Sequence, residues 1–555
     1  MGRLGMETEK GLYLGIDFGT TNSVVSIYNY DGDEVFTVGF DGANILPSAV
    51  LFEKGEDDKL NNIFGILAKE GAIIYPESTV LSVKRMIAAE QSVKVTVDKE
   101  QYEFKPEAIA ALILRYIKEQ ADAFVREQLK ASGEFSGCVI TVPANSSDKH
   151  KKKMKEAAVI AGFQEESVFL RLEPAAAALT YAQNLDESRT VMVYDFGGGT
   201  FDACVLDIKC IENDEPVISI LATNGDSYLG GNDMDKVIMD IIYEEFVKQT
   251  ENNFDLFDLS KDDGISIKSK KMAVMRLGQV ANQAKERLST VASTKVVLSP
   301  FLLEPHPVNI NIDISRDDFL NHKRIHRMDD IEEIFVKMQG KSPLDIIEET
   351  VKTIESCLEL SGKQRQEIDD IVLVGGTSSM PSVSDRIKDY FQKEPFKSAI
   401  SPALSISAGA AYYCHQIMLP NQAGAKVVEK TVHPLGIELS GRRFLEVVSR
   451  DIEIPLEGLV IEAPALLETN FDDLTSMAIA VYEATMSDTK GVNFVYEKGM
   501  KRLGGTTLRG IPQNKKGEEK VRVVFTITQD NVLTVEAKCM NEEGTITRLS
   551  VDKMY

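Results

Sequence analysis

The fold of this chain is decided by the stretch Val191-Met-Val-Tyr-Asp-Phe-Gly-Gly-Gly-Thr-Phe-Asp202. An apolar run leads to Asp195, three glycines follow, and the hydroxyl of Thr200 comes next. Glycine has no Cβ atom, so these residues can adopt positive φ and bring backbone N–H groups close to an anion. A carboxylate at the end of a strand beside such a turn can hold Mg²⁺, usually through water. The stretch alone is weak evidence for a phosphate site, because ordinary tight turns use the same residues.

A second copy of this plan strengthens the interpretation. Near the N-terminus, Leu12-Tyr-Leu-Gly-Ile-Asp-Phe-Gly-Thr-Thr-Asn-Ser23 again places an apolar strand before Asp-Phe-Gly and hydroxyl residues. Asp17 takes the place of Asp195, which indicates two related half-domains that face each other. A third turn, in Ile371-Val-Leu-Val-Gly-Gly-Thr-Ser-Ser379, ends another apolar strand with paired glycines. The order and spacing of the three turns argue against three unrelated turns.

Two phosphate hairpins followed by a glycine pair resemble the actin-like ATPase superfamily. Within it, the motifs resemble those of the seventy-kilodalton heat-shock (DnaK-type) chaperones. The resemblance implies an α/β fold: a two-lobed actin-like ATPase made of duplicated RNase H-like halves, followed by an all-β sandwich. It covers nearly the whole chain, closely to about Ile417 and more loosely after it.

The composition is that of a globular protein. At 555 residues, with 43% hydrophobic and 27% charged residues, the chain is expected to form roughly two to four domains. Its net charge of −24 argues against nucleic-acid and anionic-membrane partners, because both need a basic surface. Cys138, Cys204 and Cys539 lie in apolar runs without a CxxC pair, as expected of reduced cysteines. No apolar leader or membrane-length apolar run occurs, so we expect a cytoplasmic protein.

Three segments are expected along the chain. The ATPase domain is expected over 11–423, the linker over 424–432 and the peptide-binding sandwich over 433–553. The sandwich prediction rests on a change of the apolar period to two, as in the hairpin pattern from Val521 to Lys538. The chain ends at Tyr555, shortly after that pattern, and we expect no helical lid.

The linker departs from the family pattern. In relatives it is aliphatic and docks as a strand on the ATPase domain, whereas Lys426, Glu429 and Lys430 interrupt the valines here. We therefore expect the coupling between the two domains to be weaker or rewired.

The resemblance also assigns catalytic residues. Asp17 and Asp195 correspond to the aspartates that hold the Mg²⁺ shell of ATP or ADP, mainly through water. Lys84 stands at the family's catalytic lysine, which neutralises charge on the γ-phosphate and orients the attacking water. Without the resemblance, Lys84 would be read as a solvated surface lysine. Glu173 corresponds to the glutamate that orders the metal-bound water, and Thr200 completes the set.

The nucleotide-binding residues implied by the resemblance lie in the three turns, in a further Gly-Gly loop and on one helix. They are Gly19, Thr20, Thr21, Asn22, Gly197, Gly198, Gly199, Thr200, Gly230, Gly231, Lys285, Ser289, Gly375, Gly376, Thr377 and Ser379. Three adenosine contacts of the family are altered. Asn282 replaces a glutamate, Glu286 stands where an arginine or apolar residue packs on the base, and Ser379 replaces a stacking arginine. We expect an intact phosphate site beside an altered adenine site.

Two residues are implied to relay the nucleotide state. Pro143 matches a proline that switches with nucleotide, and Lys151 stands at the arginine that transmits the change. Lysine keeps the charge but lacks the planar fork needed for bidentate contacts. Apart from this role, the basic run Lys149-His-Lys-Lys-Lys153 is expected to be a solvated helix face.

The implied client is an unfolded or extended polypeptide. Ile437, Met477 and Ile479 occupy positions that line the peptide channel in relatives, although each is at least as well explained as ordinary sandwich core. A J-domain co-chaperone and a nucleotide exchange factor are the further partners that the resemblance implies.

Three functions are weighed. The first is an ATP-dependent molecular chaperone with hydrolysis in the actin-like domain. The second is a weakly nucleotide-binding, non-catalytic scaffold or co-chaperone, which the altered adenine contacts, the altered linker and the expected absence of a lid would suit. The third, a sugar-kinase-type enzyme, is least favoured because it needs a polar cleft between lobes and not an appended sandwich.

Overall fold

The computed structural model describes residues 11–89, 92–130, 134–144, 146–183, 185–211, 215–328, 336–396, 400–419, 425–431, 433–450, 452–455, 458–484, 494–497, 499–528, 530, 532–540 and 546–551. The expected domain boundary at 420–424 lies outside these residues.

The first lobe is built on a mixed sheet. Its strands run in the order β11 (Val168–Leu172), β10 (Gly137–Val142), β1 (Leu12–Phe18), β2 (Asn22–Asn29) and β3 (Glu34–Thr37), with β4 (Leu46–Pro47) beside β2. β1 runs antiparallel to β2 and parallel to β10. The β1–β2 hairpin is the first predicted glycine turn, and it leaves Asp17 near the end of a buried strand.

The second lobe repeats this arrangement. Its strands run in the order β17 (Asp370–Val374), β12 (Arg189–Phe196), β13 (Phe201–Lys209), β14 (Val217–Asp226) and β18 (Lys426–Val428). β12 runs antiparallel to β13 and parallel to β17, as β1 does with its own neighbours. The second predicted turn therefore joins β12 to β13, and the third follows β17.

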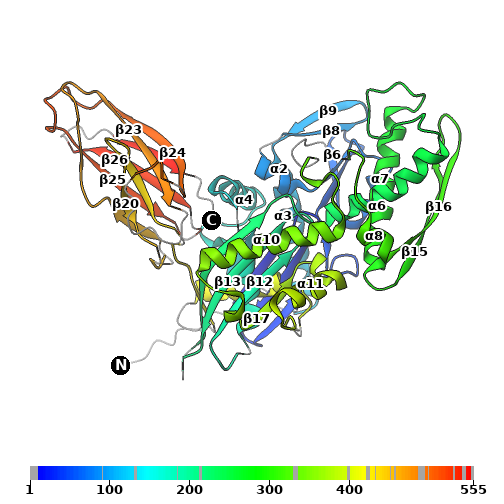
Figure 1. Ribbon diagram of the computed structural model, residues 1–555, viewed down its shortest axis with the longest axis horizontal. Helices are drawn as coiled ribbons and strands as arrows, with labels where there is room; N and C mark the ends of the chain where they lie inside the picture. The colour runs from blue at the N-terminus through cyan, green and yellow to red at the C-terminus, as the bar shows by residue number, and fades with distance from the viewer. Residues whose placement is uncertain are drawn as a thin grey trace.

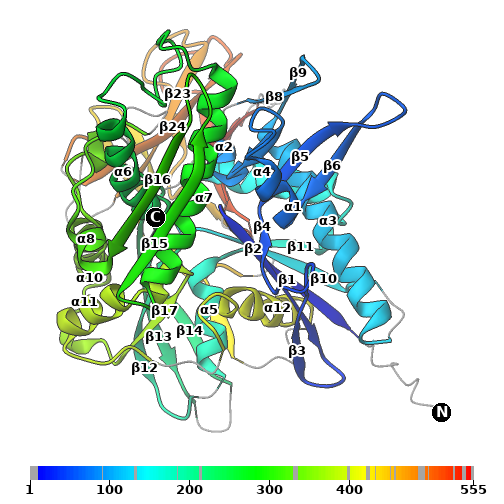
Figure 2. The same ribbon diagram turned by 90° about the vertical axis from the view of Figure 1, so that its right-hand side faces the viewer.

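Two helices rich in small residues separate the sheets. α12 (Ser405–Met418) packs on β1, β2 and β10, whereas α5 (Glu173–Ala182) packs on β12, β13 and β14. Figure 2 shows the two helices together at the foot of the space between the lobes. They cross so closely that a Cβ on Gly409 would lie 1.7 Å from the carbonyl oxygen of Ala176. The lobes therefore meet through a tightly packed helix pair.

The remaining elements of the two lobes form outer layers around these sheets. They are α1 (Gly65–Gly71), α2 (Val83–Ala89), α3 (Pro106–Glu127), α4 (Asp148–Ile160), α6 (Gly231–Gln249), α7 (Ile267–Leu288), α8 (Arg316–Asn321), α10 (Pro343–Ser361), α11 (Pro381–Phe391), β5 (Ala49–Lys54), β6 (Leu60–Phe64), β7 (Thr79–Leu81), β8 (Val93–Val97), β9 (Glu100–Phe104), β15 (Ser293–Leu302) and β16 (Val308–Ser315). α3 begins at Pro106, as a proline suited to the first turn predicts. α7 begins at Ile267 because the side chain of Ser266 caps it by accepting from the N–H of Ser269.

The C-terminal part is a β-sandwich with a core of its own. One sheet has the order β20 (Arg443–Val448), β19 (Leu435–Leu439), β23 (Ser476–Ala484) and β24 (Met500–Arg509). The other has the order β21 (Leu459–Glu462), β25 (Lys520–Ile527), β26 (Leu533–Cys539) and β27 (Ile546–Val551), with β22 (Leu467–Glu468) beside β25. β25 and β26 confirm the predicted hairpin, and Cys539 is buried as expected. None of the helices in the described part of the chain is long and apolar enough to cross a bilayer.

The sandwich and the segment expected to be the linker both contact the two lobes. Figure 1 shows the sandwich beside α4, where the Asp148 carboxylate accepts a hydrogen bond of 2.7 Å from the N–H of Leu533 in β26. In the linker, Lys426–Val428 pairs with Val217–Ser219 as a parallel strand. The charged residues of the linker therefore do not prevent strand docking, because this pairing uses backbone groups and leaves the Lys426 side chain exposed.

Candidate nucleotide site

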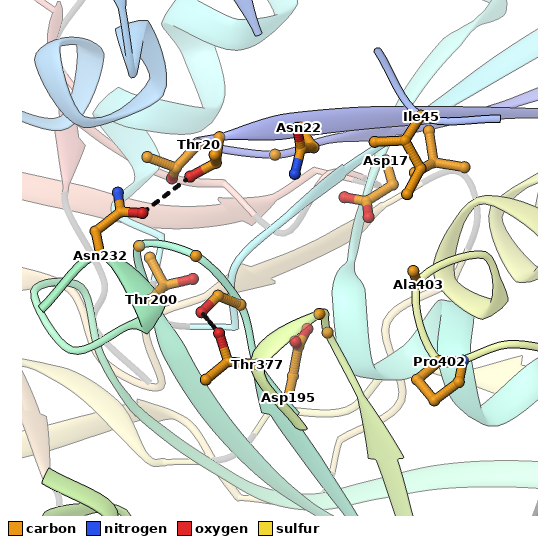
Figure 3. Close-up of a pocket in the computed structure, with 18 of the residues that line it drawn as sticks. Asp17, Thr20, Asn22, Ile45, Asp195, Thr200, Asn232, Thr377, Pro402 and Ala403 are labelled. Carbon is orange, nitrogen blue, oxygen red and sulfur yellow. Dashed lines mark hydrogen bonds between the residues drawn. The ribbon is translucent and has the colours of Figure 1, made fainter. Parts of the chain in front are cut away.

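A cavity of about 280 Å³ lies between the lobes, where the two glycine hairpins face each other (Figure 3). Most of the residues predicted to bind nucleotide or to act in catalysis line it. They are Asp17, Gly19, Thr20, Thr21, Asn22, Lys84, Glu173, Asp195, Gly197, Gly198, Gly199, Thr200, Lys285, Ser289, Gly375, Gly376 and Thr377. Gly230, Gly231 and Ser379 are not among the residues that line the cavity.

Hydrogen bonds from the start of α6 and from Thr377 hold the glycine turn after β12 in place. The N–H of Gly231 donates to the carbonyl of Gly197 at 3.0 Å, and the N–H of Asn232 donates to that of Gly198 at 2.8 Å. Thr377 Oγ1 also donates to Gly197 O, at 2.9 Å. A Cβ on Gly198 would lie 2.5 Å from the Thr21 hydroxyl of the opposite hairpin, so the close approach requires glycine. Gly231 therefore supports the turn without lining the cavity.

Three carboxylates and one ammonium group meet on the cavity wall. Lys84 Nζ lies 2.7 Å from Glu173 Oε1, and both residues are almost completely buried. Desolvation, together with the nearby charge of Glu173, raises the pKa of Asp17 to about 7. The pKa of Asp195 is also raised well above its usual value, first by burial and then by Glu173. This excess of negative charge suits a divalent cation, so Asp17 and Asp195 fit the predicted role of holding Mg²⁺.

Lys84 is thus not the solvated surface residue that its sequence alone would suggest. It is 4% exposed, and α2 directs its side chain across to the start of α5, where Glu173 lies. The pair links an element of the first lobe to the helix beside the second sheet.

The far end of the cavity differs from the phosphate end. An apolar wall is formed by Ile45, Met380, Pro402, Ala403 and Ile406, with Asn282 and the exposed Glu286 also lining the cavity. Apolar surfaces of this kind accept the flat face of a base. No arginine lines the described part of the cavity.

Asp235 organises this end and was not predicted. Its Oδ1 lies 2.8 Å from Lys285 Nζ, and its Oδ2 accepts from Asn282 Nδ2 at 3.3 Å. Lys285 Nζ also donates to the carbonyl of Gly231 at 3.0 Å. These contacts fix the lysine that was predicted to contact the nucleotide.

Arg85 is a second residue that sequence reasoning left without a role. Its Nη2 donates to the carbonyl of Gly199 at 2.5 Å, so α2 of the first lobe contacts the glycine turn of the second. Its position directly after Lys84 was the one available signal in the sequence.

Comparison with known proteins decides the family. The family model described as Hsp70 protein matches residues 13–554. The chain is 33% identical over 543 residues to the Chaperone protein DnaK of Thermotoga maritima and, equally, to that of Thermotoga petrophila; these residues are 96% of this chain and 79% of each relative. The Chaperone protein DnaK of Thermosipho melanesiensis is 32% identical over the same shares. The chain belongs to the Hsp70 family. It is an ATP-dependent chaperone and an ATPase, as its motifs predicted, and no observation favours the non-catalytic alternative.

In this Hsp70 chain the sandwich reaches the first lobe through an ionic cluster. Asp530, which follows β25, accepts from the N–H of Leu170 at 3.0 Å and from Lys155 Nζ at 2.8 Å. Arg171 Nη1 lies 3.5 Å from Asp530, and Arg171 Nε lies 3.6 Å from Glu429 beyond β18. One buried arginine of the ATPase lobe therefore contacts both the linker region and the sandwich.

The two predicted relay residues lie near this cluster. Pro143 is buried directly after β10, and Lys151 is 1% exposed on α4. Burial lowers the pKa of Lys151, while nearby carboxylates of the linker region and the sandwich oppose that shift. The expectation of a solvated basic face over Lys149–Lys153 is therefore wrong at Lys151. The exposed members are Lys149 and Lys152.

The three predicted peptide-binding residues lie in the sandwich core. Ile437 is 0% and Ile479 is 2% exposed, and Met477 packs partly buried against the same cluster. Their side chains pack with the residues of the sandwich core, which is the alternative that the sequence left open. Their role in peptide binding stays a prediction.

Proposed function

We propose that this Hsp70 chain hydrolyses Mg²⁺·ATP in the cavity between its lobes and couples hydrolysis to the binding of extended polypeptide. The observation that carries the proposal is the buried pair of Lys84 and Glu173 between Asp17 and Asp195, facing two glycine turns. Phosphoryl transfer needs positioning and charge neutralisation more than covalent chemistry by the protein, and this arrangement supplies both.

Each residue has a separate task in this proposal. The backbone N–H groups of the turns around Thr20 and Gly198 bind phosphate oxygens, and Thr200 adds a hydroxyl. Asp17 and Asp195 hold the hydration shell of Mg²⁺, which supplies neutralisation of the phosphate charge when bound. Lys84 Nζ stabilises negative charge on the γ-phosphate and, held by Glu173 at 2.7 Å, orients the attacking water.

Fold and location are part of the same proposal. The matching strand order and pairing of the two sheets support duplicated RNase H-like halves. We place the ATPase domain over 11–423, the linker over 424–432 and the sandwich over 433–553, in the cytoplasm. The sandwich supplies two sheets of extended strands, and we infer that an extended segment binds there by adding backbone hydrogen bonds. A J-domain co-chaperone and a nucleotide exchange factor are the proposed further partners.

Steady-state ATPase measurements with and without an unfolded peptide test the proposal. We expect hydrolysis that the peptide accelerates, and a loss of about 10²-fold or more in kcat for Lys84→Ala, because one electrostatic group acting on the transition state is removed. Lys59→Ala is the matched control, since that lysine is exposed and pairs only at the surface with Asp57. A Lys84→Ala variant that hydrolyses ATP at the wild-type rate would refute the assignment.

A further inference from the structure

The second lobe carries a cluster of metal-ligating side chains outside the nucleotide cavity. Asp240 and Glu244 lie one turn apart on α6, and His322 directly follows α8. The ligand atoms of the three residues all lie within 4.8 Å of one another. Residues spaced by four on a helix share a face, so the two carboxylates point toward the same histidine.

The distances suit a small tetrahedral cation. His322 Nε2 lies 2.9 Å from Asp240 Oδ2 and 4.0 Å from Glu244 Oε1. An ion with bonds of about 2.0–2.2 Å to nitrogen and oxygen places its ligand atoms roughly 3.4 Å apart, between these two values. A modest rotation of the exposed Glu244 side chain is enough to complete the three-ligand set.

One ligand is already held in place by the surrounding chain. Asp240 is 0% exposed, and its carboxylate accepts from the N–H groups of Ile325 and His326 at 3.0 and 2.9 Å. His326 Nδ1 lies 2.8 Å from Asp240 Oδ1, the oxygen farther from His322. Hydrogen bonds of this kind fix the orientation of ligands in protein metal sites.

The remaining side of the cluster is open to solvent. Glu244 and His322 line a surface hollow together with four further carboxylates and a single lysine, Lys248. The carboxylates are those of Glu245, Asp313, Asp317 and Asp318. Their field attracts cations, and the opening leaves room for water as a fourth ligand and a path of entry.

We propose that Asp240, Glu244 and His322 bind a Zn²⁺-class cation. An imidazole with two carboxylates favours zinc over magnesium or calcium, which prefer sites made of oxygen alone. The ion would join α6 to the segment that follows α8. The same helix begins at Gly231, whose N–H holds the phosphate turn at Gly197, so the metal would brace the support of the nucleotide site.

Calorimetric titration of EDTA-treated full-length chain with Zn²⁺ alone tests the proposal. Glu244→Gln removes one ligand charge, whereas Glu119→Gln removes the same charge from an exposed position on α3, outside the hollow. We expect one zinc ion per chain whose affinity falls at least about 10-fold in Glu244→Gln and is unchanged in Glu119→Gln. Zinc held by cysteines or by the nucleotide cavity would bind both variants equally.

His322→Asn supplies the second arm. An asparagine amide can still donate to Asp240, so the buried carboxylate keeps a partner while the imidazole ligand is lost. We expect zinc to raise the Tm of the wild-type chain, because a ligand that binds only the folded state stabilises it, and we expect both the binding event and this rise to be lost in His322→Asn. Absence of zinc binding in the wild-type chain, or equal binding by wild type, Glu244→Gln and His322→Asn, would overturn the proposal.

Discussion

At the scale of single residues, the phosphate end of the cavity contains the residues that the sequence predicted, whereas the base end does so only in part. The phosphate end holds the buried Asp195 and Lys84 and the partly buried Asp17, all of which had sequence signals. At the base end, Asn282 and Glu286 line the cavity where the resemblance implies other residues, and Ser379 lies outside the cavity lining. Asp235 compensates only in part, because it fixes Lys285 through a side-chain contact and offers no surface for a base to stack on.

This contrast predicts weak discrimination between bases. We expect ATP to bind more weakly than in typical relatives and with a reduced preference over GTP. Each stacked arginine contact is worth roughly 0.5–2 kcal/mol, so the loss of two weakens binding by about one or two decades. Calorimetry with ADP and GDP measures both quantities. Tight and strongly adenine-selective binding would mean that the apolar wall around Met380 and Ile406 replaces the missing contacts.

A second residue-scale prediction concerns acid sensitivity. Burial on α4 lowers the pKa of His150 from its usual 6.5 to about 3. The unfolded chain therefore binds a proton at this histidine near pH 6.5, whereas the native state binds it only near pH 3. The free energy of unfolding therefore falls as pH falls between these two values. The loss from this group approaches ~1.4 kcal/mol per pH unit below pH 6.5. Urea unfolding of wild type and His150→Gln at pH 7 and 5 should show a smaller pH dependence in the variant. The exposed His306→Gln is the control, and an equal pH dependence in all three would contradict the prediction.

At the scale of elements, the crossing of α5 and α12 decides how the lobes are joined. Both helices had recognisable sequences, and the alanines of α5 read as an ordinary helix after Pro174. The partner of each helix was not visible in the sequence, because Ala176 and Gly409 are far apart in the chain. Their contact depends on the absence of one Cβ atom.

Gly409→Ala tests this crossing. The new methyl group would lie 1.7 Å from the Ala176 carbonyl oxygen, which is backbone and cannot rotate away. We expect a loss of about 1–3 kcal/mol or more in unfolding free energy, as for overpacked cores. Gly278→Ala is the matched control within α7, where the nearest atom is Met239 Sδ at 3.9 Å. That change should raise Tm slightly, since alanine is favoured over glycine inside a helix. If the Gly409→Ala protein is as stable as wild type, α5 and α12 can move apart without cost, and the close crossing does not require glycine.

At the scale of the whole molecule, the features that could be predicted were those that depend on a short, continuous segment of sequence. The hairpins at Asp17 and Asp195 and the helix from Pro106 follow from local periodicity and turn residues. The contacts of Arg171 with Asp530 and Glu429 could not be predicted, because they join residues far apart in sequence across separately folded parts. The charged residues of the linker predict weaker or rewired coupling between the domains, and the pairing of β18 with β14 does not test this. Strand docking depends on backbone hydrogen bonds, and the pattern of side chains in a sequence gives little information about where they form.

The docked linker and sandwich lead to the final prediction, that nucleotide controls peptide release through Asp530. Its side chain is 7% exposed and pairs with the half-buried Lys155 and the buried Arg171, so Asp530→Asn leaves the buried arginine with less compensation. Breaking a buried ion pair costs about 3–5 kcal/mol, enough to weaken docking of the sandwich. Stopped-flow release of a labelled apolar peptide should be faster with ATP than with ADP in wild type, and this difference should shrink in Asp530→Asn. Glu536→Gln is the control, because its partner Arg548 lies within the sandwich. Equal release rates with ATP and ADP in the wild-type chain would instead support the expectation from the linker sequence, that the two domains are only weakly coupled.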